Sequence, residues 1–386
     1  MKRIYSIDFT RGFVMMIMAL DHVRDMMHVN AGLQSPTDLA TTTPMLFFTR
    51  WITHLCAPTF VFLAGTSVYL AFKNKGISQS RNFLIKRGLW LILLEFTVVN
   101  FGLFFSPGFN AIFFEVIAAI GAGFFILSLL LKLSAKTIGI IGLAVICLHD
   151  LVFLIPMGQQ SMLISIFSPF FSMAAIPLFP NHVLVIAYPP IPWLGIMLAG
   201  FATGKLFELP EDARKKIFLR IGCGALLFFI VARFINIYGD PAPWSVQKTP
   251  VLTFLSFINI TKYPPSLLFC SVMLGLMFLI LAFAEQAKNK VADIAYTYGK
   301  VPLFYFIVHF YLIHTLLIIL LFIQGFHWAD LDFASGGFGR PKGSVSGLPL
   351  WGVYLTWIGV VAVLYRPCIW FGKYKAEHSY WWLKYI

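Results

Sequence analysis

Charge is the property that this sequence has least of. Of its 386 residues only 12% are charged, whereas a soluble domain of this length carries roughly 25%. Acidic side chains are the scarcest, with 16 Asp and Glu against 29 Lys and Arg. The hydrophobic share is 59% and the mean hydropathy is +0.82. This composition excludes a large soluble domain and predicts an integral membrane protein in a lipid bilayer.

Cysteine is also scarce, which excludes two further classes. The five cysteines all lie in apolar stretches, and none has the spacing of a zinc site or a disulfide framework. We therefore expect no metal. The net charge of +13 would suggest nucleic acid in a soluble protein, but no soluble basic domain is present to bind it. We expect no nucleic-acid partner, and we assign the basic residues to membrane interfaces.

Long hydrophobic runs are what the sequence has instead. Each is near the ~20 residues that a helix needs to cross a bilayer, and none alternates as a barrel strand would. The fold class is therefore an all-α, polytopic integral membrane protein with about ten transmembrane helices. We expect these helices at residues 11–30, 45–73, 85–105, 110–132, 137–157, 183–204, 217–237, 265–285, 301–325 and 350–371.

No composition shift marks a boundary between domains, so residues 1–386 are expected to form a single transmembrane domain. The stretch 158–182 is apolar yet broken by three prolines, which favours an interfacial or re-entrant segment.

The distribution of basic residues predicts the orientation. With a cytoplasmic N-terminus, 22 of the 29 Lys and Arg fall on the inner side. The positive-inside rule therefore places both termini in the cytoplasm, which agrees with an even number of crossings.

Charged side chains inside a membrane cost about 2.5–3.5 kcal/mol each, so they need a partner or a cavity. They gather in the first helix, where Asp21, Asp25 and His28 share one helical face and His22 lies on its flank. By helical rise, His22 is roughly 16 Å from Arg11, near the midplane.

The second helix carries Arg50 and His54, four residues apart, and Pro58 frees the carbonyl of His54. By the same rise, His54 is expected at the depth of His22. A neutral imidazole can take and return a proton near pH 7, so we favour a functional role for these two histidines.

Other intramembrane polar residues have structural interpretations. Arg24 and Arg50 either extend to the outer interface or pair with an anion. Glu95 and Glu115 are expected to tie helices together by pairing with an arginine. His309 and His314 are expected to form interhelical hydrogen bonds.

Two stretches resemble the heparan-α-glucosaminide N-acetyltransferase catalytic-domain family. One is Arg3-Ile-Tyr-Ser-Ile-Asp8-Phe-Thr-Arg11-Gly12 before an apolar helix, and the other is Ala57-Pro58-Thr-Phe-Val-Phe-Leu-Ala-Gly65-Thr-Ser67. The later stretches Tyr188–Gly204 and Gly299–Tyr305 are similar to bacterial members. The Arg11-to-His22 spacing also resembles the R-x10-H of bacterial membrane O-acyltransferases.

The resemblance implies a transmembrane acyltransferase that passes an acyl group, expected to be acetyl, from cytoplasmic acetyl-CoA to a sugar on the far side. In the O-acyltransferases the histidine matching His22 is catalytic. In the heparan branch that position is usually Asn, and His28 is the nearest candidate for the catalytic His. His54 stands where the family has an acidic residue.

We therefore expect His22 or His28 to act as general base or acyl carrier. Asp21, Asp25 or Asp8 would orient it, and His54 and Arg50 would hold the acceptor or the oxyanion. Basic residues near Arg11, Lys73 and Arg87 would draw the CoA phosphates.

The expected partners are acyl-CoA, a saccharide or other envelope acceptor, the bilayer and, as one option, a second copy in a homodimer. The expected location is a bacterial inner membrane. The alternatives are a transporter or flippase that uses the same polar cluster, and a non-catalytic membrane scaffold.

Overall fold

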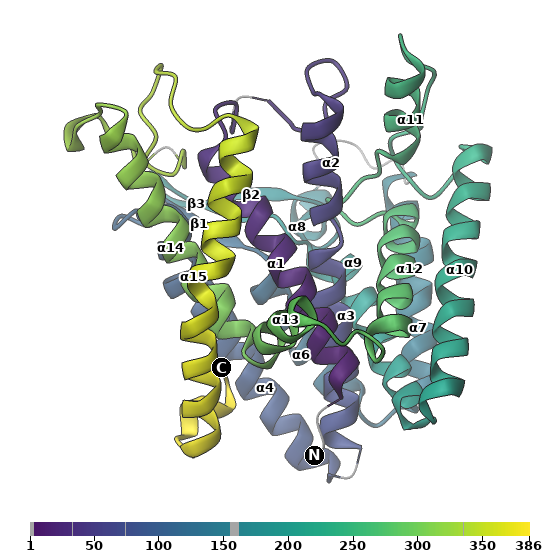
Figure 1. Cartoon of the computed structure of the whole chain (residues 1–386). Coiled ribbons are helices and arrows are strands. Elements are labelled where there is room, and N and C mark those ends of the chain that lie inside the picture. Colours follow the sequence, from purple (N-terminus) through teal and green to yellow (C-terminus); the bar gives the residue numbers. More distant parts are fainter. Residues whose placement is uncertain (1–3, 33, 74, 155–161, 335) are drawn as a thin grey trace. The chain divides into compact units, whose positions relative to one another are not determined.

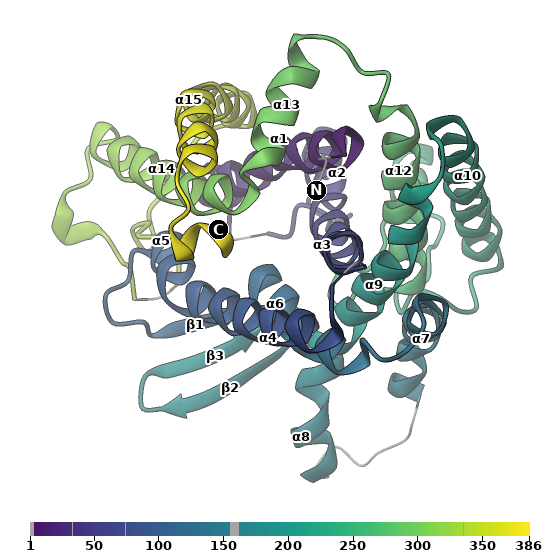
Figure 2. The same cartoon turned by 90° about the horizontal axis from the view of Figure 1, so that it is seen from below.

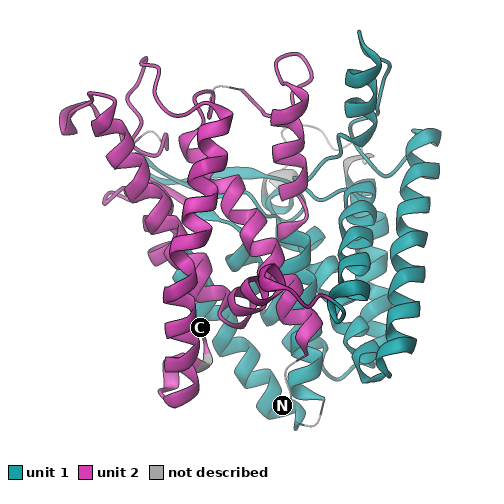
Figure 3. Ribbon diagram, viewed as in Figure 1, with its two compact units in different colours: residues 1–3, 57–95, 113–286 teal, residues 4–56, 96–112, 287–386 magenta. Residues whose placement is uncertain are grey.

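The computed structural model describes residues 4–32, 34–73, 75–154, 162–334 and 336–386 (Figure 1). These residues are 70% helical and 5% strand. They group into two compact units (Figure 3). Unit 1 is built from residues 57–95 and 113–286, and unit 2 from residues 4–56, 96–112 and 287–386. The single domain expected over 1–386 stays a prediction.

Unit 2 is arranged around one helix, α1 (Tyr5–Met27). The neighbours that pack on α1 are α2 (Pro44–Thr53), α13 (Lys290–Lys300), α14 (Pro302–Ile323) and α15 (Leu350–Glu377). Viewed from below, α13 crosses beside α1 with α14 and α15 next to it (Figure 2). The unit also contains α5 (Asn100–Phe104) and the short helices η4 (Trp328–Asp330) and η5 (Trp381–Lys384).

Unit 1 is a set of packed helix pairs. α10 (Glu211–Ile235) packs on α12 (Leu267–Ala284), α7 (Ala135–Leu148) on α9 (Pro190–Thr203), and α4 (Ile77–Leu94) on α6 (Val116–Leu130). The remaining helices are α3 (Cys56–Phe72), the π-helix η1 (Glu95–Val99, whose last four residues belong to unit 2), η2 (His149–Leu154), α8 (Met162–Phe171), η3 (Gly204–Glu208) and α11 (Pro250–Ile258).

A small sheet interrupts this helical order. It has the strand order β1-β3-β2, from β1 (Ala111–Phe114), β2 (Ala174–Phe179) and β3 (His182–Ile186). β2 and β3 form an antiparallel hairpin in which Ala174 pairs with Ile186, with an irregularity between Pro177 and Phe179.

Helix starts follow from local chemistry. Proline stands at the first turn of α2, α9, α11 and α14, where its missing N–H costs nothing. Side-chain oxygens of N-cap residues accept first-turn N–H groups at five helices. These caps are Thr43, Ser134, Thr249, Ser266 and Asn289.

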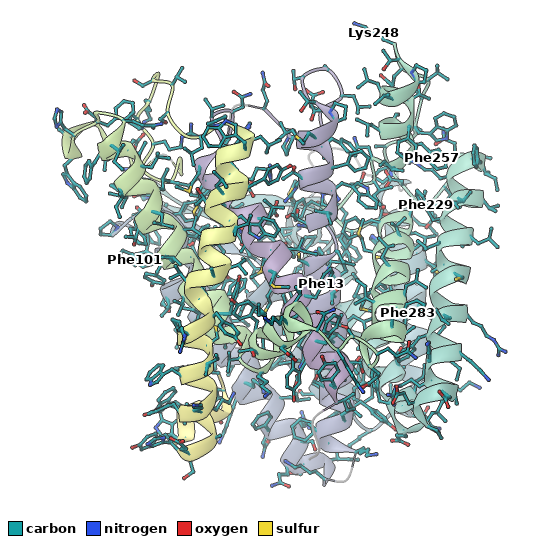
Figure 4. All side chains as sticks on the ribbon, viewed as in Figure 1. Phe13, Phe101, Phe229, Lys248, Phe257 and Phe283 are labelled. Carbon is teal, nitrogen blue, oxygen red and sulfur yellow. The ribbon has the colours of Figure 1, made fainter. Side chains whose placement is uncertain are left out.

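Eight helices are long and apolar enough to span a membrane, among the residues described. α1 and the shorter α6 complete the set of ten segments that the sequence predicted. The surface agrees with lipid contact, since α10 exposes Leu227 (62%) and Phe234 (65%). Figure 4 shows side chains of this helix directed outward along its length.

Several expected boundaries were wrong, for identifiable reasons. The helix expected at 45–73 breaks at His54, where α2 ends and α3 begins, because Pro58 removes the N–H that would have bonded to His54. The helix expected at 183–204 begins only at Pro190, since β3 holds the preceding Val- and Ile-rich residues in strand pairing. Within the expected 158–182 segment lie α8 and the start of the hairpin, while residues 158–161 are outside the described part.

Candidate active site

Helix α1 carries a buried cluster of ion pairs. Arg24 Nη2 lies 2.7 Å from Asp21 Oδ1 and 2.7 Å from Asp25 Oδ1. Arg50 Nη1 on α2 donates to Asp21 Oδ2. Two carboxylates and two guanidinium groups balance in charge, which lowers the cost of burying them. Of the two interpretations of Arg24 and Arg50, pairing with an anion is therefore the one that the structure supports.

His22 lies against α14 rather than in that cluster. Its ring centroid is 5.1 Å from His309 and 4.5 Å from Phe310. Its side chain is partly exposed, whereas His309 is fully buried. His22 is five residues before the end of α1, about 7.5 Å along the axis. Its depth in a bilayer stays a prediction.

His28 follows the end of α1, on the far side of the ion pairs from His22. Its backbone N–H donates to Arg24 O at 3.0 Å, and its Nδ1 accepts the N–H of Asn30 at 3.3 Å. Burial, and then the charges of Arg24 and Arg340, lower the pKa of His28. The ring is therefore neutral near pH 7, with its proton on Nε2.

A small pocket of about 40 Å³ opens beside His28. Its lining includes Arg24, Asp25, Asn30 and Thr42. Its size suits a few water molecules rather than a sugar. Asp25 faces this region with 43% of its side chain exposed.

Arg340 fastens the end of α1 to the loop before α15. Its Nη1 donates to the carbonyls of His28 (2.9 Å) and Ala31 (3.3 Å), and Nη2 donates to Val29 O (3.2 Å) and to Ser346 O. Burial lowers the pKa of this guanidinium. The contact also positions His28, which forms a parallel bridge with Leu348.

The N-terminal half of α1 contains the Arg11-Gly12 motif. Asp8 and Arg11 form an i,i+3 ion pair at 3.7 Å. A Cβ on Gly12 would lie 1.6 Å from Ala295 O, and one on Gly299 would lie 1.7 Å from Asp8 O. Both glycines are therefore required where α1 and α13 touch through their backbones. Gly12 and Gly299 come from two different motif stretches, yet both allow the backbones of α1 and α13 to touch.

The other predicted site residues lie apart from this cluster or in unit 1. His54 is the buried C-cap residue that follows α2, with 4% exposed. In unit 1, Lys73 Nζ pairs with Glu208 Oε1 at 3.2 Å, and Arg87 lies 6.0 Å from the ring centroid of Phe83.

Glu95 has a different partner from the arginine that the sequence suggested. Its Oε2 accepts the N–H groups of Ile117 (2.9 Å) and Ala118 (3.0 Å) in the first turn of α6. It thus ties two helices by capping an N-terminus, where the backbone N–H groups favour negative charge. This contact assigns Glu95 to structure.

Two buried polar groups make contacts that the sequence did not identify. In unit 1, Arg233 donates to the carbonyls of Phe257, Ala242, Ser256 and Asn259 at 2.7–3.1 Å. Arg233 thereby ties the end of α10 to the loop that follows it and to α11, and Phe229 of α10 and Phe257 of α11 face each other 5.7 Å apart (Figure 4). The signal was an arginine in the last turn of an apolar helix, which suits the carbonyl end.

The second such group is His309, for which the sequence predicted interhelical bonding without a partner. Its contact with His22 comes from the packing of α1 on α14, which no local spacing encodes.

One protein-family model matches this chain, over residues 3–238, and its description is heparan-alpha-glucosaminide N-acetyltransferase, catalytic. Among curated proteins, none matches. The matched region includes α1, with the ion-pair cluster and both candidate histidines, and ends shortly after α10. Because it spans more than half of the sequence, the chain belongs to the heparan-alpha-glucosaminide N-acetyltransferase catalytic family, whose members are membrane acyltransferases.

Proposed function

We propose that this protein transfers an acetyl group from cytoplasmic acetyl-CoA to a sugar or other cell-envelope acceptor across a bacterial inner membrane. The observation that carries the proposal is the arrangement on α1, inside the family-matched region. His22 lies on this helix and His28 directly after it, next to a charge-balanced set of ion pairs whose Asp21 and Arg24 are buried.

His22 is the residue that we assign as general base. The residue is partly exposed, which leaves a path for substrate. It lies about 7.5 Å from the end of α1, measured along the helix axis by helical rise. His28 is the second candidate. Its Nδ1 lone pair accepts the Asn30 N–H, so its neutral ring presents an N–H donor at Nε2. That suits holding an acceptor oxygen or an oxyanion better than taking a proton.

The ion pairs fix the other roles. Arg24 and Arg50 occupy the oxygens of Asp21, which holds α2 against α1 beside His22. We propose that the positive charge of Arg50 stabilises the oxyanion. Arg11 in unit 2 and Lys73 and Arg87 in unit 1 are each proposed to attract CoA phosphates, and Asp8 is proposed to take part in cofactor binding beside Arg11.

The transfer step balances without a metal or redox partner. The acceptor hydroxyl or amine gives its proton to His22 as its oxygen or nitrogen bonds to the thioester carbonyl carbon. The carbon–sulfur bond then breaks, and the CoA sulfur takes the proton back from His22. General-base catalysis of this kind typically contributes about 10²–10⁴-fold.

Both ends of the chain are proposed to be cytoplasmic. In unit 2 the bridge between His28 and Leu348 joins the C-terminal end of α1 to the N-terminal end of α15. The two helices therefore run antiparallel. Their other ends, near Tyr5 and Glu377, then point the same way. Single cysteines in the 30–44 and 74–84 loops of a cysteine-free variant should label from opposite sides; labelling from one side would contradict the topology.

The test of the function is calorimetry and turnover on the purified protein in detergent. We expect binding of CoA and acetyl-CoA, and transfer of labelled acetyl to candidate envelope sugars. Folded protein that binds no CoA at millimolar concentration would contradict the proposal and favour a transporter.

A further inference from the structure

A second histidine from α14 lies beside the proposed base. His309 is 0% exposed, and its ring centroid is 5.1 Å from that of His22. α1 and α14 pack together within unit 2. His309 lies beyond residues 3–238, so the family match does not cover it.

The bonds of His309 fix its tautomer. Nδ1 is 3.2 Å from Tyr305 O and 2.5 Å from Phe306 O. Carbonyl oxygens can only accept, so Nδ1 carries the hydrogen, and the lone pair of the neutral ring is on Nε2. Among the residues described, this buried Nε2 has no hydrogen-bond partner. Buried acceptors rarely lack one, so this nitrogen is set to receive a donor.

The surroundings of His309 are aromatic. Tyr305 stacks on it at 5.7 Å, and the Phe306 and Phe310 rings lie at 5.6 Å and 4.3 Å. Such walls favour neutral groups, and two imidazolium ions 5.1 Å apart would repel each other. The pair can therefore hold one positive charge far more easily than two.

Carboxylates usually orient a catalytic histidine, and the sequence favoured Asp21, Asp25 or Asp8 for that task. Here Arg24 and Arg50 bond to the oxygens of Asp21, and Arg24 also bonds to Asp25. The imidazole of His309 is the acceptor that lies against His22 itself.

We propose that His309 is a positioning residue for His22: when the neighbouring rings turn toward each other, the His22 ring N–H donates to the lone pair of His309 Nε2, which has no partner in the part of the chain that the structure describes. This bond directs the other nitrogen of His22 toward the acyl acceptor, and it stabilises the imidazolium that forms when His22 takes the acceptor's proton. His309 itself gains no proton. The role in transfer rests on the proposed function, whereas the pairing of the two rings does not.

Two amide substitutions distinguish the roles of the two ring nitrogens of His309. The amide of His309→Asn can reach the Nδ1 position and keep the bonds to the carbonyls, but it leaves no acceptor at Nε2. The amide of His309→Gln reaches the Nε2 position and restores an acceptor there. A purely structural role of His309 requires the bonds from Nδ1 to the backbone carbonyls. The proposed role requires the acceptor at the Nε2 position.

The matched control is His314→Asn on the same helix. His314 is also 0% exposed, with Nδ1 3.3 Å from Gly102 O, and its ring stacks on Phe105. Other titratable or charged groups that face the pair are retained in every variant. They are Tyr305, which stacks on His309, the groups Cys56, Tyr298 and Cys368 that act on Tyr305, and Asp21, Arg24 and Asp25 on α1.

The experiment is an NMR titration of the full chain in detergent with ¹³C-labelled histidine, the His22 signal being assigned by its loss in His22→Ala. In His309→Asn we expect His22 to titrate at lower pH than in the wild type, because its imidazolium loses an acceptor. In the pH dependence of kcat, the acid limb should also move to lower pH. We expect kcat to be reduced about 10- to 10²-fold, with KM for acetyl-CoA unchanged. His309→Gln and His314→Asn should titrate like the wild type.

A folded His309→Asn variant in which His22 titrates as in the wild type would overturn the proposal. If that variant does not fold, His309→Gln decides, since a folded Gln variant whose His22 titration departs from that of the wild type also overturns it. Because the titration needs no substrate, a shifted His22 signal in a protein that binds no acetyl-CoA would refute the proposed function and leave the histidine pair standing.

Discussion

Arg233 in unit 1 and His309 in unit 2 are both buried polar side chains on long apolar helices, yet their bonding differs. Arg233 directs its donors to four backbone carbonyls and lies 3.9 Å from Asp240. Asp240 in turn accepts from Thr261 and Ser266 at 2.7–2.9 Å. His309 uses one ring nitrogen for its own helix, while the other has no hydrogen-bond partner among the described residues.

The difference separates structural from chemical roles. A buried group whose bonds are all made is held in one arrangement, and changing it costs stability. A buried group with an acceptor left over can serve a neighbour that gains and loses a proton. On this criterion Arg233 of unit 1 is a fixed charge, whereas we propose that His22 and His309 of unit 2 are the reactive imidazoles, and the substitutions below test that difference.

The largest expected effect is on His22→Ala in unit 2. Turnover with acetyl-CoA should fall by about 10²–10⁴-fold, because the proton of the acceptor loses its base. Binding of CoA, measured by calorimetry, should remain. His28→Ala is the companion variant: if it is inactive while His22→Ala keeps full turnover, the base is His28, and if both are fully active no histidine of α1 is the base.

The next effect is on Arg233→Met in unit 1. The substitution keeps an apolar chain of similar reach but leaves four carbonyls without their donor and Asp240 without its cation. Removing one partner of a buried ion pair costs roughly 3–5 kcal/mol, so the thermal midpoint in detergent should fall sharply. Arg220→Met, at an exposed position of the same helix, is the control and should change little. Equal midpoints for the two variants would contradict the structural assignment.

A smaller effect is expected for Gly12→Ala, at the contact between α1 and α13. The new Cβ would lie 1.6 Å from Ala295 O, so the helices must separate. Overpacking of this kind costs about 1–3 kcal/mol. Gly359→Ala, which meets open space on α15, should be neutral or slightly stabilising, since Ala favours helix. The measurement is thermal unfolding of both variants, and a stable Gly12→Ala would show that the backbones do not touch.

The smallest effect is the pH dependence that comes from His28. Burial, with Arg24 and Arg340, lowers its pKa in the folded state. The unfolded chain therefore binds a proton first as pH falls below about 6.5, and stability decreases through that range. We expect the loss between pH 7.5 and pH 5 to be smaller in His28→Gln than in the wild type. If the stability of His28→Gln has the same pH dependence as that of the wild type, His28 does not contribute to the loss of stability at low pH.

The sequence predicted the membrane helices because each is a long apolar run, and all ten predicted segments contain helix in the structure. It did not predict the β2–β3 hairpin, since Val183, Val185 and Ile186 continue an apolar run into α9 and give no local sign of a strand. Pro58 indicated the interruption at His54, although we expected residues 45–73 to form one helix.

The candidate site could be predicted residue by residue but not contact by contact. Spacing on α1 placed Asp21 and Asp25 on one face, but the sequence left open whether Arg50 extends to the interface or pairs with an anion, and it named no partner. Which groups met which could not be derived, because the pairing of α1 with α14 depends on packing between segments far apart in the chain. His309 therefore appeared in the sequence only as an intramembrane histidine.

The guanidinium of Arg340 makes its bonds to carbonyl oxygens rather than to carboxylates, and this determines how the end of α1 responds to ionic strength. Dissolved ions screen an exposed pair such as Lys73 and Glu208, in which each side chain is 37% exposed. They have far less influence on a half-buried guanidinium that bonds to the carbonyls of His28, Val29 and Ala31 at short range. The segment that holds His28 should consequently keep its protection from hydrogen exchange in molar salt, while the surface pairs of unit 1 weaken.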